Sequence, residues 1–164
     1  MRVYIPATLS MLQRLVADGT MQPLSGTAFA VTPALREAYA EGDDEELAEV
    51  AISEAALASL RLLAAEPQGD LPLRRAVVVA DAEATPRADL DDAVVRISGP
   101  VSTDQVVAVY VDNAAAEPAV AEAIEVIDDA DLGDEDAELT VGDAQDHDLA
   151  WYATQELPFL LELL

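Results

Sequence analysis

Three runs of apolar, mostly β-branched residues stand out in the middle of the chain. They occupy residues 76–80, 93–97 and 106–111, and valine is the commonest residue in each. Short runs of this kind are typical of strands, so we expect them to form the central strands of a sheet. The first run is apolar without interruption, which further predicts a strand covered on both faces.

The pattern before these runs predicts two strands and three helices. Thr8 and Thr32 are capping residues at two helix starts, and Pro33 suits a first helical position. The third helix opens at Asp43, and its apolar surface is broad enough for burial against more than one neighbour or a partner chain. We expect strands over residues 2–5 and 27–31, and helices over residues 9–18, 33–41 and 43–65.

The pattern after the first run is less regular. The link from Gly99-Pro100 to the third run is too short for a helical crossover, so we expect the second and third runs to be antiparallel. Alternating positions predict a hairpin near the C-terminus. We expect a helix ending near residue 127, an acidic loop over 128–136, hairpin arms at 138–141 and 149–152 joined by 142–148, and a final helix over 154–164.

This order of elements predicts one α+β domain over residues 1–164, with helices packed on a mixed, mainly antiparallel sheet. The length suits a single domain, and an apolar fraction of 52% supplies a core. The N-terminus lacks a signal-peptide pattern, and no stretch reaches the roughly 18 apolar residues of a membrane span. We therefore expect a cytoplasmic protein without a membrane partner.

Charge changes the picture most. The chain has 33 acidic residues, eight arginines and no lysine, and its net charge is −25. Residues 116–164 hold fifteen of the acids and no arginine. Such a surface repels nucleic acid and attracts basic partners. Two interpretations stay open: a background of a GC-rich coding sequence that favours solubility, or a functional surface that binds a basic protein or imitates nucleic acid.

The acidic segment does not have the pattern of a calcium site. Counting back from Gly133, apolar Ala130 and Leu132 fall where an EF-hand needs ligands. We therefore predict no metal site and interpret the segment as an acidic surface. Its candidate residues are Asp128, Asp129, Asp131, Asp134, Glu135 and Asp136.

Recognisable catalytic and cofactor motifs are missing from the sequence. It has no cysteine, no phosphate-binding glycine pattern and no lysine for covalent chemistry. His147 is the only histidine, and no serine lies in a nucleophile elbow. We therefore expect no cofactor and, on balance, no enzymatic activity.

Two further groups are candidates for binding. Tyr4, Arg14 and Arg36 lie in the one segment that is not acidic, where electrostatics favours a small anionic ligand. His147 and Trp151 are candidates for a recognition surface, and the apolar C-terminal segment that starts with Trp151 is a candidate dimer contact. Burial in the core or in ordinary ion pairs is the simpler interpretation of each.

Three segments resemble an uncharacterised family of small acidic actinobacterial proteins: MRVYIPAT at residues 1–8, GTAFAVTPAL at 26–35 and HDLAWY at 147–152. The resemblance spans nearly the whole chain. It implies a GC-rich actinobacterial source, which suits the missing lysine. It implies no activity and no site residues.

From the sequence we predict a non-enzymatic protein-interaction or regulatory module that engages a basic partner through residues 128–148. One alternative is a small-molecule-binding protein or enzyme that uses Tyr4, Arg14, Arg36 and His147. Another is a nucleic-acid mimic, which requires carboxylates arrayed at phosphate-like spacing.

Overall fold

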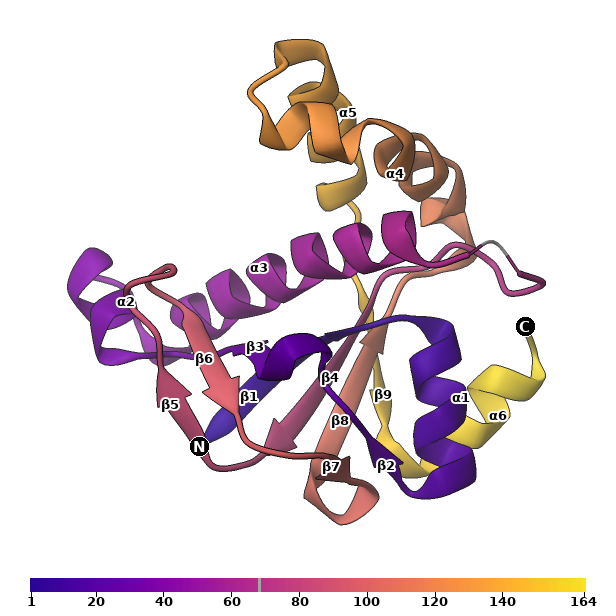
Figure 1. The fold of residues 1–164 in the computed structure, drawn as a ribbon, viewed down its shortest axis with the longest axis horizontal. Coiled ribbons are helices and arrows are strands. Elements are labelled where there is room, and N and C mark those ends of the chain that lie inside the picture. Colours follow the sequence, from indigo (N-terminus) through magenta and orange to yellow (C-terminus); the bar gives the residue numbers. More distant parts are fainter. Residues whose placement is uncertain (68) are drawn as a thin grey trace.

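The computed structural model describes residues 1–67 and 69–164. Within them, a seven-stranded sheet has the order β5-β6-β3-β1-β4-β8-β9, and each of its pairings is antiparallel (Figure 1). The predicted α+β fold is thereby confirmed. The strands are β1 (Arg2–Ala7), β3 (Thr27–Phe29), β4 (Ala76–Asp81), β5 (Ala84–Pro86), β6 (Val94–Ile97), β8 (Val106–Val111) and β9 (Ala150–Ala153), with β2 (Thr20–Met21) and β7 (Val101–Ser102) in a separate pair.

The helices form layers on both faces of the sheet. Two of them, α1 and α6, cover one face, and α3 crosses the other; α4 and α5 stack on α3 and project away from the sheet (Figure 1). None of the helices in the described ranges is both long and apolar enough to cross a bilayer. Their bounds are α1 (Leu9–Asp18), α2 (Pro33–Ala38), α3 (Asp44–Ala65), α4 (Glu117–Asp131), α5 (Glu135–Gln145) and α6 (Leu157–Glu162).

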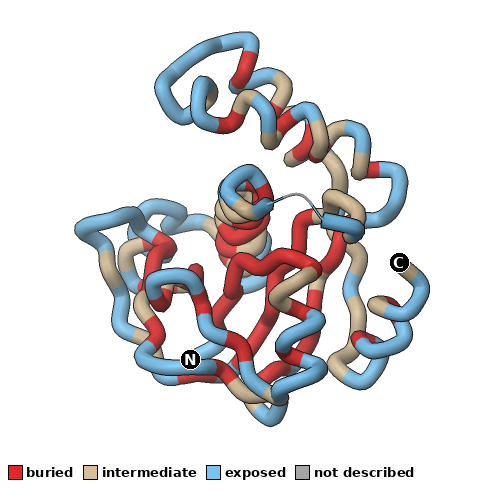
Figure 2. Tube along the Cα trace, turned by 45° about the vertical axis from the view of Figure 1, so that its right-hand side comes forward, coloured by how far each residue is buried: buried red, intermediate tan, exposed pale blue. Residues whose placement is uncertain are grey.

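Strand β4 lies at the centre of the fold, with β1 on one side and β8 on the other. Its valines alternate between two cores: Val78 packs with α1 and α6, whereas Val77 and Val79 pack under α3. Residues 76–80 are all buried, as Figure 2 shows for the middle of the sheet. The expectation that both faces of this strand are covered is therefore correct.

Helix α3 begins where Asp43 accepts a hydrogen bond from the backbone N–H of Glu46 at 2.9 Å. Small residues such as Ala51 and Ala55 face the sheet and let the helix approach it closely. Buried Ser59 donates to the carbonyl oxygen of Ala7 (2.7 Å) and accepts from the N–H of Ala76 (3.1 Å), so its hydroxyl joins β1 to β4. The other side of the helix packs on α4, which accounts for its broad apolar surface.

The predicted acidic loop and C-terminal hairpin are wrong in part. Residues 128–131 end α4, and residues 138–141 lie inside α5 and form no strand. Ala137, Val141 and Ala144 are buried at helical spacing, whereas Leu139 is exposed. Strand β9 does form, but it pairs with β8 instead of with residues 138–141.

The expected relation between the second and third runs is also wrong. Strands β6 and β8 are separated by β3, β1 and β4, so they do not form the antiparallel pair that the short link predicts. The chain between them forms β7, which pairs with β2, and a 3-10 turn at Thr103–Gln105. Neither β2 nor β5 was expected, because both are short segments inside stretches with turn composition.

Candidate functional site

A buried ion pair joins the two central strands at one end of the sheet. Arg75 precedes β4 and Asp112 follows β8, and the pairing of Ala76 with Val111 places them opposite each other. The guanidinium donates from Nε to Asp112 Oδ2 (2.8 Å) and from Nη2 to Asp112 Oδ1 (2.7 Å). The exposed fractions are 1% for Arg75 and 0% for Asp112. Burial of two charges is tolerated here because both are paired and hydrogen-bonded.

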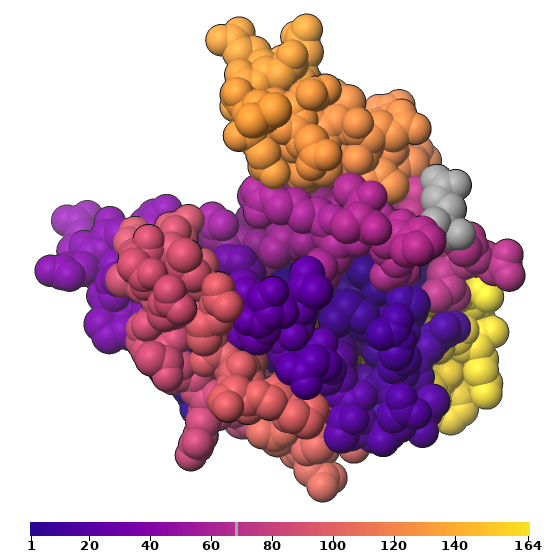
Figure 3. Space-filling view, in the orientation of Figure 1, coloured from indigo at the N-terminus to yellow at the C-terminus, as the bar shows by residue number. Residues whose placement is uncertain are grey.

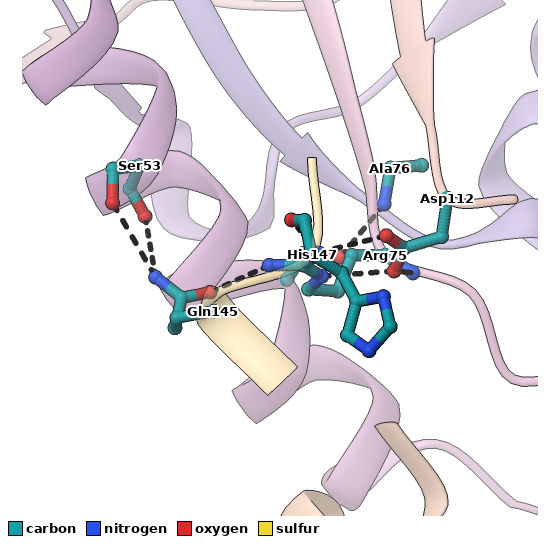
Figure 4. Close-up of polar contacts among 7 residues, drawn as sticks. Ser53, Arg75, Ala76, Asp112, Gln145 and His147 are labelled. Carbon is teal, nitrogen blue, oxygen red and sulfur yellow. Dashed lines mark hydrogen bonds and ion pairs between the residues drawn. The ribbon is translucent and has the colours of Figure 1, made fainter. Parts of the chain in front are cut away.

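The remaining donors of Arg75 hold the chain that returns from α5 to β9. Nη1 donates to Oε1 of Gln145 (2.9 Å), and Nη2 also donates to the backbone carbonyl of His147 (2.7 Å). Figure 4 shows Gln145 between Arg75 and Ser53, whose carbonyl accepts from Gln145 Nε2 at 3.1 Å. One arginine thus connects β4, β8, α3 and the end of α5.

A cleft of about 420 Å³ lies beside this network, and we call it the α3–β8 cleft. Its lining comes from α3, from the end of α5 and the chain that follows it, and from Arg75 and Tyr110. Its lining residues are Glu49, Ile52, Ser53, Ala56, Arg75, Tyr110, Gln145, His147, Asp148 and Leu149.

The α3–β8 cleft is negatively charged. Asp112 balances the charge of Arg75, and all three guanidinium nitrogens already donate hydrogen bonds. Glu49 and Asp148 are exposed, and among the described residues neither carboxylate has an ion-pair or hydrogen-bond partner. Two acidic residues therefore line the cleft, and His147 is the one lining residue besides Arg75 with a basic side chain.

Trp151 lies next to the cleft but does not line it. It pairs with Tyr110 across β8 and β9, so the two side chains share the α3 side of the sheet. Its exposed fraction is 57%. Of the residues predicted to bind, the structure therefore brings His147 and Trp151 to the same region.

The second candidate feature is the acidic hairpin, which we define as residues 117–148. It contains thirteen acidic residues and no arginine or lysine. Figure 3 shows it standing above α3 as a separate lobe. Two of its acids are paired with the body of the protein, Asp131 with Arg61 (2.9 Å) and Glu117 with Arg74 (3.0 Å). The hydrogen bond from Arg61 holds the pKa of Asp131 below its usual range.

All six acids predicted to form a surface are exposed on this hairpin. Asp128, Asp129 and Asp131 lie in the last turn of α4, and Glu135 and Asp136 lie in the first turn of α5. Asp134 caps α5 by accepting from the N–H of Ala137 at 2.9 Å. Two leucines lie among them with large exposed fractions, 88% for Leu132 and 70% for Leu139.

The other residues predicted to bind a ligand lie in three separate places. Tyr4 is buried in β1 under α3, and that burial raises the pKa of its phenol. Arg36 is exposed on α2 and pairs with Asp44 at 2.6 Å. Arg14 lies on α1, on the opposite face of the sheet from Tyr4, and lines a second cleft of about 670 Å³ with Ser10.

The C-terminal helix, α6, has one buried side and one exposed side. Leu157 and Leu160 are buried in the core shared with α1. Phe159 and Leu163 are exposed, with fractions of 68% and 85%. The dimer contact expected for this segment stays a prediction. The exposed side chains of Phe159 and Leu163 are the ones that could form it.

Sequence reasoning missed Arg75, Asp112, Gln145 and Tyr110. The sequence holds one signal for the pair: Arg75 comes directly before the first apolar run, and Asp112 comes directly after the third. Recognising the pair requires knowing that these two runs are neighbours in the sheet. Within the described ranges, no group of three or more potential ligands is placed to hold a metal ion.

Comparison with known proteins identifies one family. A family of unknown function, DUF6912, matches residues 1–161. No curated protein was found to match the chain. No solved structure was found to match it either. Since the match extends over almost the entire sequence, the chain belongs to the DUF6912 family.

Proposed function

We propose that this protein is a non-enzymatic protein-interaction module that binds a basic protein through residues 128–148. One observation carries the proposal: the acidic hairpin projects from the body and presents many acids without an arginine or lysine. A lobe of this shape is accessible to a partner from several sides. Its charge attracts a basic surface and accelerates encounter with it.

The exposed leucines support a protein partner. Leu132 follows Asp131 at the tip of the hairpin, and Leu139 follows Glu138 on α5. An interface gains specificity when apolar contacts lie among charges of one sign. A basic protein that also carries apolar side chains therefore fits this surface better than a simple polycation.

The position of the acids supports a role beyond solubility. Asp128 and Asp129 in the last turn of α4 lie at the negative end of the helix dipole, where each costs about 0.3–1 kcal/mol. Acids at the start of α5 are favourable by the same reasoning. Charge is thus concentrated at the tip even where it opposes helix stability.

We also propose that the protein acts in the cytoplasm of an actinobacterium, the setting that the sequence implies. Arginine as the only strongly basic residue type supports a GC-rich source. The ligand-binding alternative has less support, because Tyr4, Arg14 and Arg36 do not share a pocket.

Two variants with equal charge changes test the proposal. The hairpin-neutral variant carries Asp128→Asn, Asp129→Asn, Glu135→Gln and Asp136→Asn, and it leaves the ion pair of Asp131 and the cap of Asp134 intact. The body-neutral variant carries Glu37→Gln, Glu41→Gln, Glu83→Gln and Asp104→Asn, which are exposed residues outside the hairpin. Circular dichroism checks that both fold.

Immobilised wild type and both variants are incubated with extract of the native host, and captured proteins are quantified by mass spectrometry. We expect wild type and body-neutral variant to retain a basic protein that the hairpin-neutral variant loses at least tenfold. The purified protein should then rebind by calorimetry with the same ranking. Equal losses in the two variants would mean that net charge alone attracts the captured proteins, and the proposal would be wrong.

A further inference from the structure

We infer that the α3–β8 cleft binds one arginine or lysine side chain of the partner. This inference rests on the proposed function, since it names the group through which the basic partner is recognised. The cleft and the proposed docking surface are continuous: Gln145, His147 and Asp148 belong to residues 128–148 and also line the cleft. A partner that lies along the hairpin toward β9 therefore reaches residues that line the cleft.

The charges in the cleft select a cation over an anion. Glu49 on α3 and Asp148 beyond α5 both line the cleft, and neither forms an ion pair among the described residues. Arg75 does not offset them, because Asp112 neutralises it and its guanidinium nitrogens are already engaged. An anionic ligand would meet two acidic residues, and His147 is the only lining side chain besides Arg75 that could carry a positive charge.

The uncharged lining suits the rest of such a side chain. Ile52, Ala56 and Leu149 give apolar contacts for the methylene stem of arginine or lysine. The ring of Tyr110 adds attraction for a cation that settles over its face. The volume of about 420 Å³ is near the lower end of the range for ligand pockets, which fits a single side chain.

The network around Arg75 prepares this site before a partner arrives. It fixes the backbone of His147 to the sheet and the side chain of Gln145 to α3. The hydrogen bonds from Arg75 to Gln145 and from Gln145 to Ser53 thereby join the end of α5 to α3. A fixed cavity loses little conformational freedom when a side chain enters it.

The first experiment titrates the protein with N-acetyl-L-arginine amide and, separately, with the N-acetyl-L-citrulline amide, which has nearly the same shape and no charge. Amide resonances of residues 145–149 and Tyr110 report binding by NMR, and Trp151, the only tryptophan, gives a fluorescence signal beside the cleft. We expect saturable shifts at these positions with the arginine compound. Equal binding of the citrulline compound, or shifts confined to other regions, would overturn the inference.

Matched variants locate the interaction. Glu49→Gln with Asp148→Asn should weaken arginine amide binding at least about fivefold, and Tyr110→Leu about threefold. The control combines Glu45→Gln on α3 with Asp143→Asn on α5, both exposed and outside the lining. It should bind as wild type does. Unchanged binding in the Glu49 and Asp148 double variant would also overturn the inference.

The purified basic partner separates this inference from the proposed function. If the hairpin-neutral variant loses the partner but the Glu49 and Asp148 double variant retains full affinity, the cleft inference falls and the proposed function stands. If the hairpin-neutral variant retains the partner, the proposed function falls, and the inference falls with it. Loss in both variants, with replacement of one partner arginine by citrulline reproducing the cleft effect, supports both.

Discussion

Arg75 and Asp112 decide the local geometry of the candidate site. A buried ion pair is a poor source of net stability, because removing two charges from water offsets most of their attraction. An apolar pair would hold β4 against β8 equally well. What it would not do is donate to Gln145 Oε1 and to the carbonyl of His147. The pair is therefore best understood as the device that positions the chain after α5.

Removal of one partner should be costly. Arg75→Met leaves Asp112 buried without its cation, and we expect a loss of about 3–5 kcal/mol in the free energy of unfolding, measured by urea titration. Arg36→Met removes an exposed pair of similar length and should cost about 1 kcal/mol or less. Amide exchange should accelerate at residues 145–149 in the Arg75 variant alone. Similar stabilities for the two variants would contradict this assignment.

The acidic hairpin is the element on which the proposed function depends most. It packs on α3 through a small core that includes Leu60, Leu63, Val120, Ile127 and Val141. This core is separate from the two that surround the sheet. The hairpin can therefore carry unfavourable charge at its tip while the sheet supplies the stability of the fold.

The elements of this fold differ in how far the sequence predicts them. The valine-rich strands were predictable because β-branched runs have few other stable arrangements. Helix α5 was not, because its buried face consists of Ala137, Val141 and Ala144, and alanine is only weakly apolar. Exposed Leu139, next to Thr140 and Val141, gives this segment a residue pattern that is typical of a strand. The pair formed by Arg75 and Asp112 depends on strand neighbours far apart in the chain, so no local pattern revealed it.

The cap of α5 offers a test at this scale. Asp134→Ala removes the acceptor for the N–H of Ala137 and should cost about 1 kcal/mol, with faster amide exchange in the first turn of α5. Asp134→Asn keeps an acceptor and should be close to neutral. Asp136→Ala is the control, since Asp136 is exposed two positions later and caps nothing. Equal exchange in the Asp134 and Asp136 alanine variants would show that packing on α3 alone fixes the start of the helix.

Charge is distributed unevenly over the whole molecule. All eight arginines lie within residues 2–96, and six of them are paired with carboxylates in the described part of the chain. The hairpin has no arginine or lysine of its own. The molecule therefore has two differently charged parts. In the body, ion pairs offset part of the negative charge, whereas in the hairpin most of the repulsion between carboxylates is not offset.

Salt should therefore stabilise this protein. Screening weakens the attractive pairs and the repulsion alike, but most pairs are exposed and individually weak, whereas the net charge is −25. Repulsion should dominate, so we expect Tm to rise between about 20 mM and about 500 mM NaCl, as the Debye length shrinks from about 20 Å to about 4 Å. The rise should be smaller in the hairpin-neutral variant than in the body-neutral variant, because the removed charges are more crowded in the hairpin.

Calorimetry at several NaCl and KCl concentrations separates screening from ion-specific effects. A Tm that falls with salt would mean that the ion pairs outweigh the repulsion, and an equal rise in both variants would mean that the hairpin is not where the repulsion is concentrated.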